Sequence, residues 1–132
     1  MSDTAELDET ALLARSDAVV RALRDWTVGR IHELRVEHAL HDAPHNPSDR
    51  RRWALGLDEV RGGAFAEIER LSRIRRAANL AWGEDRWADI GELGHRYRAQ
   101  LPDDVAAAAH HLCEAARAFP GRGRAQQPNP LP

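Results

Sequence analysis

Apolar residues recur at helical spacing through most of this 132-residue chain, and this periodicity restricts the fold more than any other feature of the sequence. The apolar side chains return every three or four residues, the interval that places them on one face of an α-helix. Alternating apolar and polar residues bounded by turn residues, the pattern of β-strands, are absent from the sequence. The sequence therefore predicts an all-α protein.

The first predicted helix is long. Asp3 and Glu6, three residues apart, resemble the capping pair that begins a helix. Pro44 cannot continue a helix and disfavours helical backbone in the residue before it, so we expect this helix to end near Asp42. Its expected inner face is a stripe formed by Val20, Leu23, Thr27, Ile31 and Leu34.

A second long helix is predicted to begin at Asn46 and Pro47, because Asn caps helix N-termini and Pro suits the first helical position. The apolar residues keep helical timing across Gly62 and Gly63, which predicts a kink at this pair, and Gly83 is expected to end the helix. The expected inner face consists of Trp53, Leu57, Val60, Ala64, Ile68, Leu71, Ala78 and Trp82.

Two shorter helices are expected after Gly83. One contains Trp87, Ile90, Leu93 and Tyr97, and the other begins at Pro102 and Asp103 and reaches Phe119. We therefore expect a bundle of about four helices, two long and two short, in a single domain over residues 1–119. Residues 120–132 are rich in Pro, Gly, Arg, Gln and Asn and can bury little apolar surface, which predicts a disordered tail.

The sequence also predicts a cytoplasmic protein without a membrane partner. The single cysteine, Cys113, cannot form an internal disulfide, and the acidic N-terminal residues lack the basic and apolar regions of a signal peptide. The longest uninterrupted apolar run, residues 105–109, is far shorter than the roughly 20 residues that span a bilayer.

Histidines and acidic residues gather where the first helix is expected to end. On a helix, His38 and His41 would share one face, with Asp42 one turn from His38 and His45 in the following loop. Three imidazole nitrogens and one carboxylate suit zinc or a similar divalent ion, the one cofactor that the sequence suggests. The alternative is that these histidines cap the last carbonyl groups and interact with the helix dipole.

Arginine provides all 19 basic residues, and these are unevenly distributed although the net charge is only −2. Residues 1–46 contain nine acidic residues and five arginines, whereas residues 47–83 contain five acidic residues and eight arginines. A cluster of arginines can neutralise nucleic-acid phosphates. The alternative is a solvated helix face with ion pairs one turn apart, such as Glu69 with Arg73. The clustered arginines toward the end of the second helix are Arg70, Arg73, Arg75 and Arg76.

A family resemblance covers residues 66–98. The run AEIERLSRIRRAA over residues 66–78, followed by WADIGELG over residues 87–94, resembles small actinobacterial helix-turn-helix proteins. In that family a recognition helix follows the glycine turn and reaches bases in the DNA major groove. The resemblance implies that Arg96 and Arg98 contact bases or phosphates. The alternative is that Trp87, Ile90 and Tyr97 are core residues and these arginines are solvated.

No arrangement of residues in the sequence indicates catalysis. Tryptophans at positions 26, 53, 82 and 87 provide large apolar surfaces, some of which would remain exposed for a partner in a small bundle. The sequence therefore predicts a non-enzymatic interaction or regulatory protein that binds another protein or itself. Metal binding through residues 38–45 and DNA binding through residues 70–98 are the alternatives.

Overall fold

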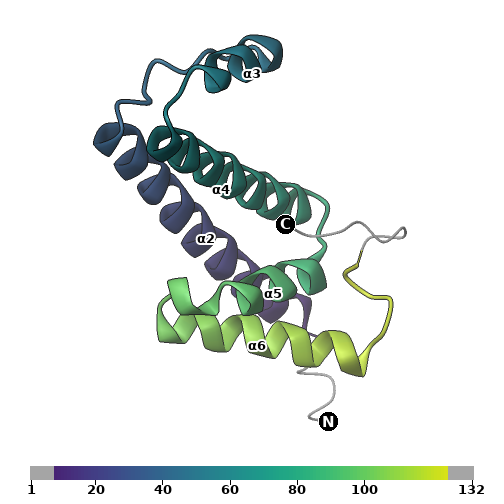
Figure 1. Cartoon of the computed structure of the whole chain (residues 1–132). Coiled ribbons are helices and arrows are strands. Elements are labelled where there is room, and N and C mark those ends of the chain that lie inside the picture. Colours follow the sequence, from purple (N-terminus) through teal and green to yellow (C-terminus); the bar gives the residue numbers. More distant parts are fainter. Residues whose placement is uncertain (1–7, 125–132) are drawn as a thin grey trace.

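The computed structural model describes residues 8–124, and this part of the chain is helical without β-strands (Figure 1). The predicted all-α class is confirmed, with five α-helices in this range where about four were expected. The elements in chain order are α2 (Glu9–Glu37), α3 (Pro47–Leu55), α4 (Glu59–Gly83), α5 (Trp87–Arg96), the 3-10 turn η1 (Arg98–Gln100) and α6 (Asp103–Ala118).

Side-chain caps fix the starts of the first three helices. Asp8 accepts a hydrogen bond from the backbone N–H of Thr10 at α2, and Asp58 accepts one from Arg61 at α4. Asn46 accepts a bond from the backbone N–H of Ser48, so the start of α3 lies where the sequence predicts it. The predicted capping pair Asp3 and Glu6 lies outside the described residues.

The two long helices, α2 and α4, form an antiparallel hairpin that supports all the other elements (Figure 1). Helices α5 and α6 pack together and cover one end of this hairpin, while α3 lies at the other end. The hairpin therefore has a four-helix end, where α2, α4, α5 and α6 meet, and a two-helix end, where α2 and α4 pack against each other with α3 beside them.

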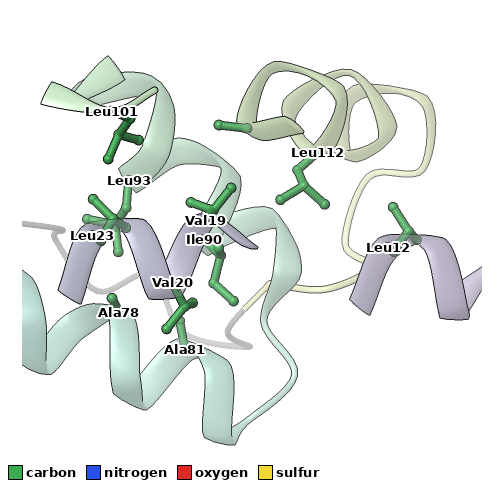
Figure 2. Close-up of a cluster of buried hydrophobic side chains, with 11 residues drawn as sticks. Leu12, Val19, Val20, Leu23, Ala78, Ala81, Ile90, Leu93, Leu101 and Leu112 are labelled. Atoms are coloured by element: carbon green, nitrogen blue, oxygen red, sulfur yellow. The ribbon is translucent and has the colours of Figure 1, made fainter. Parts of the chain in front are cut away.

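Each end has its own buried cluster. The core of the four-helix end, shown in Figure 2, consists of Leu12, Val19, Val20, Leu23, Ala78, Ala81, Ile90, Leu93, Leu101, Ala109 and Leu112. The core of the two-helix end consists of Ile31, Leu34, Leu40, Ala64, Ile68, Leu71 and Ile74. The α2 stripe predicted from the sequence runs through both clusters, and all five of its residues are buried.

Two glycines allow the close approach of α5 to α6. A Cβ atom at Gly94 would lie 2.6 Å from the Cβ of Ala109 and 2.8 Å from a methyl group of Val19. A Cβ atom at Gly91 would lie 2.7 Å from the Cβ of Leu112. These distances are too short for a real side chain, so the packing of the four-helix end requires glycine at both positions.

The predicted second long helix is two helices. The chain leaves helical geometry between Leu55 and Glu59, and the Gly62-Gly63 pair lies inside α4. Gly56 ends α3 and Asp58 caps the start of α4. The prediction of one helix was wrong because the apolar residues keep the same helical spacing across this break. Ala64, Ile68, Leu71 and Ala78 are buried as predicted, whereas Val60 and Trp82 are 69% and 37% exposed.

The predicted end of the first helix was also wrong. Helix α2 ends at Glu37, and Ala39 adopts a left-handed backbone with φ 51°. The next N–H, that of Leu40, bonds to the carbonyl of Arg35 at 2.8 Å, and the Leu40 side chain is buried. This left-handed cap, and not Pro44, terminates the helix. Asp85, with φ 55°, terminates α4 in the same way.

Residues 120–124, placed in the predicted tail, are described and contact the four-helix end. The carbonyl of Gly123 accepts a hydrogen bond from the backbone N–H of Ala88, and Arg124 forms an ion pair with Glu92. Residues 125–132, the rest of the predicted tail, lie outside the described residues. Among the helices of residues 8–124, none has the length and apolar character required to cross a membrane.

Candidate functional sites

The predicted metal ligands do not converge in the structure. His38 is the C-terminal cap of α2 and is half-buried, whereas His41, Asp42 and His45 are exposed in the following loop. Because α2 ends at Glu37, His38 and His41 do not share a helix face. Between residues 8 and 124, no group of three or more His, Cys, Asp or Glu side chains is arranged to hold a metal ion.

The histidine segment, residues 38–45, connects α2 to α3 and is hydrogen-bonded to the start of α4. The backbone N–H of His38 donates to the carbonyl of Leu34, and the carbonyl of His38 accepts a 3.2 Å bond from the Nε of Arg61. A guanidinium from the start of α4 therefore satisfies the carbonyl that follows α2. The His38 imidazole lies 3.8 Å from the Glu37 carboxylate, close enough for an ion pair when the imidazole is protonated.

The arginines predicted to contact nucleic acid have different surroundings. Arg70 donates two hydrogen bonds to Glu67 and lies over the ring of Tyr97. The hydrogen bond from Arg70 lowers the pKa of Glu67, although burial opposes this effect. Arg75 is half-buried, and its buried Nε has no hydrogen-bond partner among the described residues. The exposed members of the set are Arg73, Arg76, Arg96 and Arg98.

The helix-turn-helix resemblance places a turn at Gly94 and a recognition helix directly after it. In the structure Gly94 is buried inside α5, which continues to Arg96. The next α-helix begins at Asp103, after η1, and packs against α5. Arg98 lies in η1 and donates a 2.7 Å bond to the carbonyl of His95. Nucleic-acid binding through these six arginines remains a prediction from the sequence.

Cys113 is half-buried on α6, beside the contact with Gly91. Burial raises the pKa of its thiol, and the nearby carboxylate of Glu92 raises it further, against smaller opposite effects of Arg117 and Arg124. His110, one turn earlier on α6, lies 3.0 Å from Glu114. The thiol is thus held in its neutral form, which suits a packing residue.

The α3–α4 turn carries a surface feature that sequence reasoning missed. Leu55 and Val60, on either side of the turn, are 83% and 69% exposed, the two highest values among the large apolar residues in the described range. We call residues 55–60 the tip. The helical spacing of the sequence predicts Leu57 and Val60 on an inner face, and this prediction is wrong for Val60. The signal that could have found the tip is the sequence Gly56, Leu57, Asp58, Glu59, in which a helix stop is followed by a new cap.

Helix α3 lies beside α4 without burying any of its residues. Arg50 of α3 forms an ion pair with Glu69 of α4 and lies 5.7 Å from the centre of the Phe65 ring. The rings of Trp53 and Phe65 meet edge to face, 5.2 Å between centres. Between the two helices lies a cleft of about 480 Å³, which is lined by Pro47, Arg50, Arg51, Phe65, Glu69 and Arg76.

Comparison of the chain with protein-family models, curated proteins and solved structures finds no match. Among the described residues, the two-helix end carries the two most exposed large apolar side chains, Leu55 and Val60.

Proposed function

We propose that this protein is a non-enzymatic interaction protein that pairs with a second copy of itself through the tip. The observation that carries the proposal is the exposure of Leu55 and Val60 beside α3, a helix with no buried residue. Single exposed apolar residues are common on protein surfaces. Two such residues within six positions, next to the half-buried Leu57, form a local apolar surface of the kind found at protein interfaces.

The charges beside the tip favour a second copy as the partner. The exposed arginine Arg52 precedes the tip, and the exposed acidic residues Asp58 and Glu59 lie within it. A two-fold contact uses the same patch on both copies, so a patch that carries both signs can place arginine opposite carboxylate across the axis. A partner with mostly positive charge would be repelled by Arg52, and one with mostly negative charge would be repelled by Asp58 and Glu59.

Self-association is tested by sedimentation equilibrium over a range of concentrations. The wild-type protein is expected to dimerise, and the double variant Leu55→Glu with Val60→Glu to remain monomeric, because burying the new carboxylates is unfavourable. Leu80→Glu is the matched control. Leu80 is a similarly exposed apolar residue of α4, about 30 Å from Val60 along the helix, and its substitution is expected to leave dimerisation unchanged.

A charge reversal tests the orientation of the contact. Arg52→Glu and Glu59→Arg are each expected to weaken the dimer, and the combination is expected to restore part of the lost affinity. Circular dichroism confirms that each variant keeps its helix content. A wild-type protein that stays monomeric at all concentrations, or a dimer that survives both tip substitutions, would refute the proposal.

A further inference from the structure

Helix α3 is attached to α4 by few contacts, and these leave the cleft between the two helices open. The attachments are the Arg50–Glu69 ion pair, the position of the Arg50 guanidinium over the Phe65 ring and the edge-to-face contact of Trp53 with Phe65. A helix of nine residues is too short to be stable alone in water, so its position depends on these contacts and on its two connections to the chain. A molecule bound in the cleft would contact both helices and so stabilise the position of α3 on α4.

The lining of the cleft has an excess of positive charge. Three arginines face it and one carboxylate, Glu69, balances only Arg50. Arg51 on α3 and Arg76 on α4 form no ion pair with another described residue. Both side chains are exposed, and they line the cleft from different helices. Both guanidinium groups line the same cleft without an ion-pair partner, so an anion bound in it would be attracted to both.

We propose that the α3–α4 cleft binds a small phosphate-bearing anion, with Arg51 and Arg76 as its ligands. The planar guanidinium group presents paired N–H donors that match two phosphate oxygens, and such charge-assisted bonds are stronger than neutral ones. Phe65 supplies an apolar wall that excludes water from one side of the bound group. The cleft volume of about 480 Å³ is that of a small-molecule site.

The arrangement of the arginines favours a small anion over a nucleic acid. Nucleic-acid backbones are neutralised by many basic residues along an extended surface. Here two arginines from two helices line one open cleft of limited size, next to a carboxylate. The site is also separate from the tip, because neither Leu55 nor Val60 lines the cleft. Anion binding and self-association can therefore succeed or fail independently.

The test is a titration of the ¹⁵N-labelled 132-residue chain with sodium pyrophosphate, followed by two-dimensional NMR at constant ionic strength. We expect saturable shifts in the backbone amides of α3 and of residues 65–76 of α4. Arg51→Gln and Arg76→Gln are each expected to weaken binding at least tenfold, because each removes one of the two charged ligands. The matched control is Arg73→Gln, which removes an exposed arginine of α4 that does not line the cleft. Its affinity is expected to equal that of the wild type.

The same titration on the double tip variant separates the two proposals, since binding there is expected to be unchanged whether or not the protein dimerises. An absence of saturable shifts in the cleft would overturn the anion site. So would shifts that sodium chloride of equal ionic strength reproduces, or an equal loss of affinity in Arg73→Gln. Addition of a short DNA duplex provides the remaining comparison. Tighter binding of the duplex than of pyrophosphate at the same cleft residues would also overturn the proposal.

Discussion

The two ends of the α2–α4 hairpin use the same two helices but bury them to different depths. At the four-helix end, α5 and α6 enclose the apolar faces of α2 and α4, and the glycines of α5 bring the helices into close contact. At the two-helix end, the residues from outside α2 and α4 that pack on this cluster are Leu40, which is buried, and Trp53, Leu57 and Tyr97, which are partly buried. The helices are continuous, so the difference lies in their neighbours and not in their own pattern.

This contrast shows that an apolar stripe alone does not decide how firmly a helix is held. The α2 stripe has equivalent residues at both ends, and all are buried. The two ends differ in the number of helices that surround each buried residue. They therefore also differ in how far neighbouring groups can move into the cavity that a smaller side chain leaves. Substitutions matched between the two ends should therefore have unequal or opposite effects on stability.

The largest expected effect is the loss of a leucine side chain from the four-helix end. Leu93→Ala is expected to lower the free energy of unfolding by about 4 kcal/mol, because helices on several sides prevent collapse around the cavity. Leu34→Ala, at the two-helix end, is expected to cost about 2 kcal/mol, since adjacent loops and solvent can close around it. Urea unfolding followed by circular dichroism measures both values. Equal losses would mean that the two clusters form one uniform core.

Glycine substitutions should change stability in opposite directions at the two ends. Gly94→Ala is expected to destabilise the protein by about 1–3 kcal/mol, because its Cβ overlaps Ala109 and Val19. Gly62→Ala, in α4 at the two-helix end, is expected to stabilise it by about 0.5–1 kcal/mol, since a Cβ there meets no atom within 4 Å. Thermal unfolding of the two variants provides the measurement. Destabilisation by Gly62→Ala would contradict the open space around this position.

The smallest expected effect concerns Cys113, at the four-helix end. Because its pKa is raised in the folded protein, less thiolate is present near neutral pH than in the unfolded chain. Iodoacetamide should therefore modify the folded protein more slowly than the unfolded protein, with the rate rising at a higher pH. A folded pKa above the unfolded one also means that the associated stability is lost as pH rises through the folded value. Cys113→Ala should remove this alkaline component, and an unchanged pH profile would contradict the assignment.

Much of the fold could be predicted from the sequence because apolar periodicity reports burial directly. Local patterns predicted the buried stripe of α2 from Val20 to Leu34. They also predicted the start of α3 at Asn46 and Pro47 and the end of α4 at Gly83. The helix end at Glu37 could not be predicted in the same way. Left-handed caps usually contain glycine, whereas here Ala39 and, at the end of α4, Asp85 adopt the left-handed backbone.

The candidate sites were less predictable, because each depends on where helices end and meet. The predicted metal site required a helix that continues to Asp42. The left-handed cap at Ala39 ends the helix before His41 and Asp42, so this condition is not met. The cleft requires α3 and α4 to be separate and antiparallel, so that Arg51 and Arg76, 25 positions apart, line the same volume. No spacing rule within one helix relates such residues.

The stretch from His41 to Gly63 contains no buried residue, although it connects two helices that are buried along much of their length. In terms of sequence divergence, such a stretch has fewer of the restrictions that packing imposes on its neighbours. The caps Asn46 and Asp58 and the partly buried Trp53 are the restricted positions within it. Its other amino acids can change through many substitutions while α2 and α4 keep their contacts. Variation there would change the exposed surface and leave the fold intact, whereas a side chain at Gly91 or Gly94 would disturb the packing of the four-helix end.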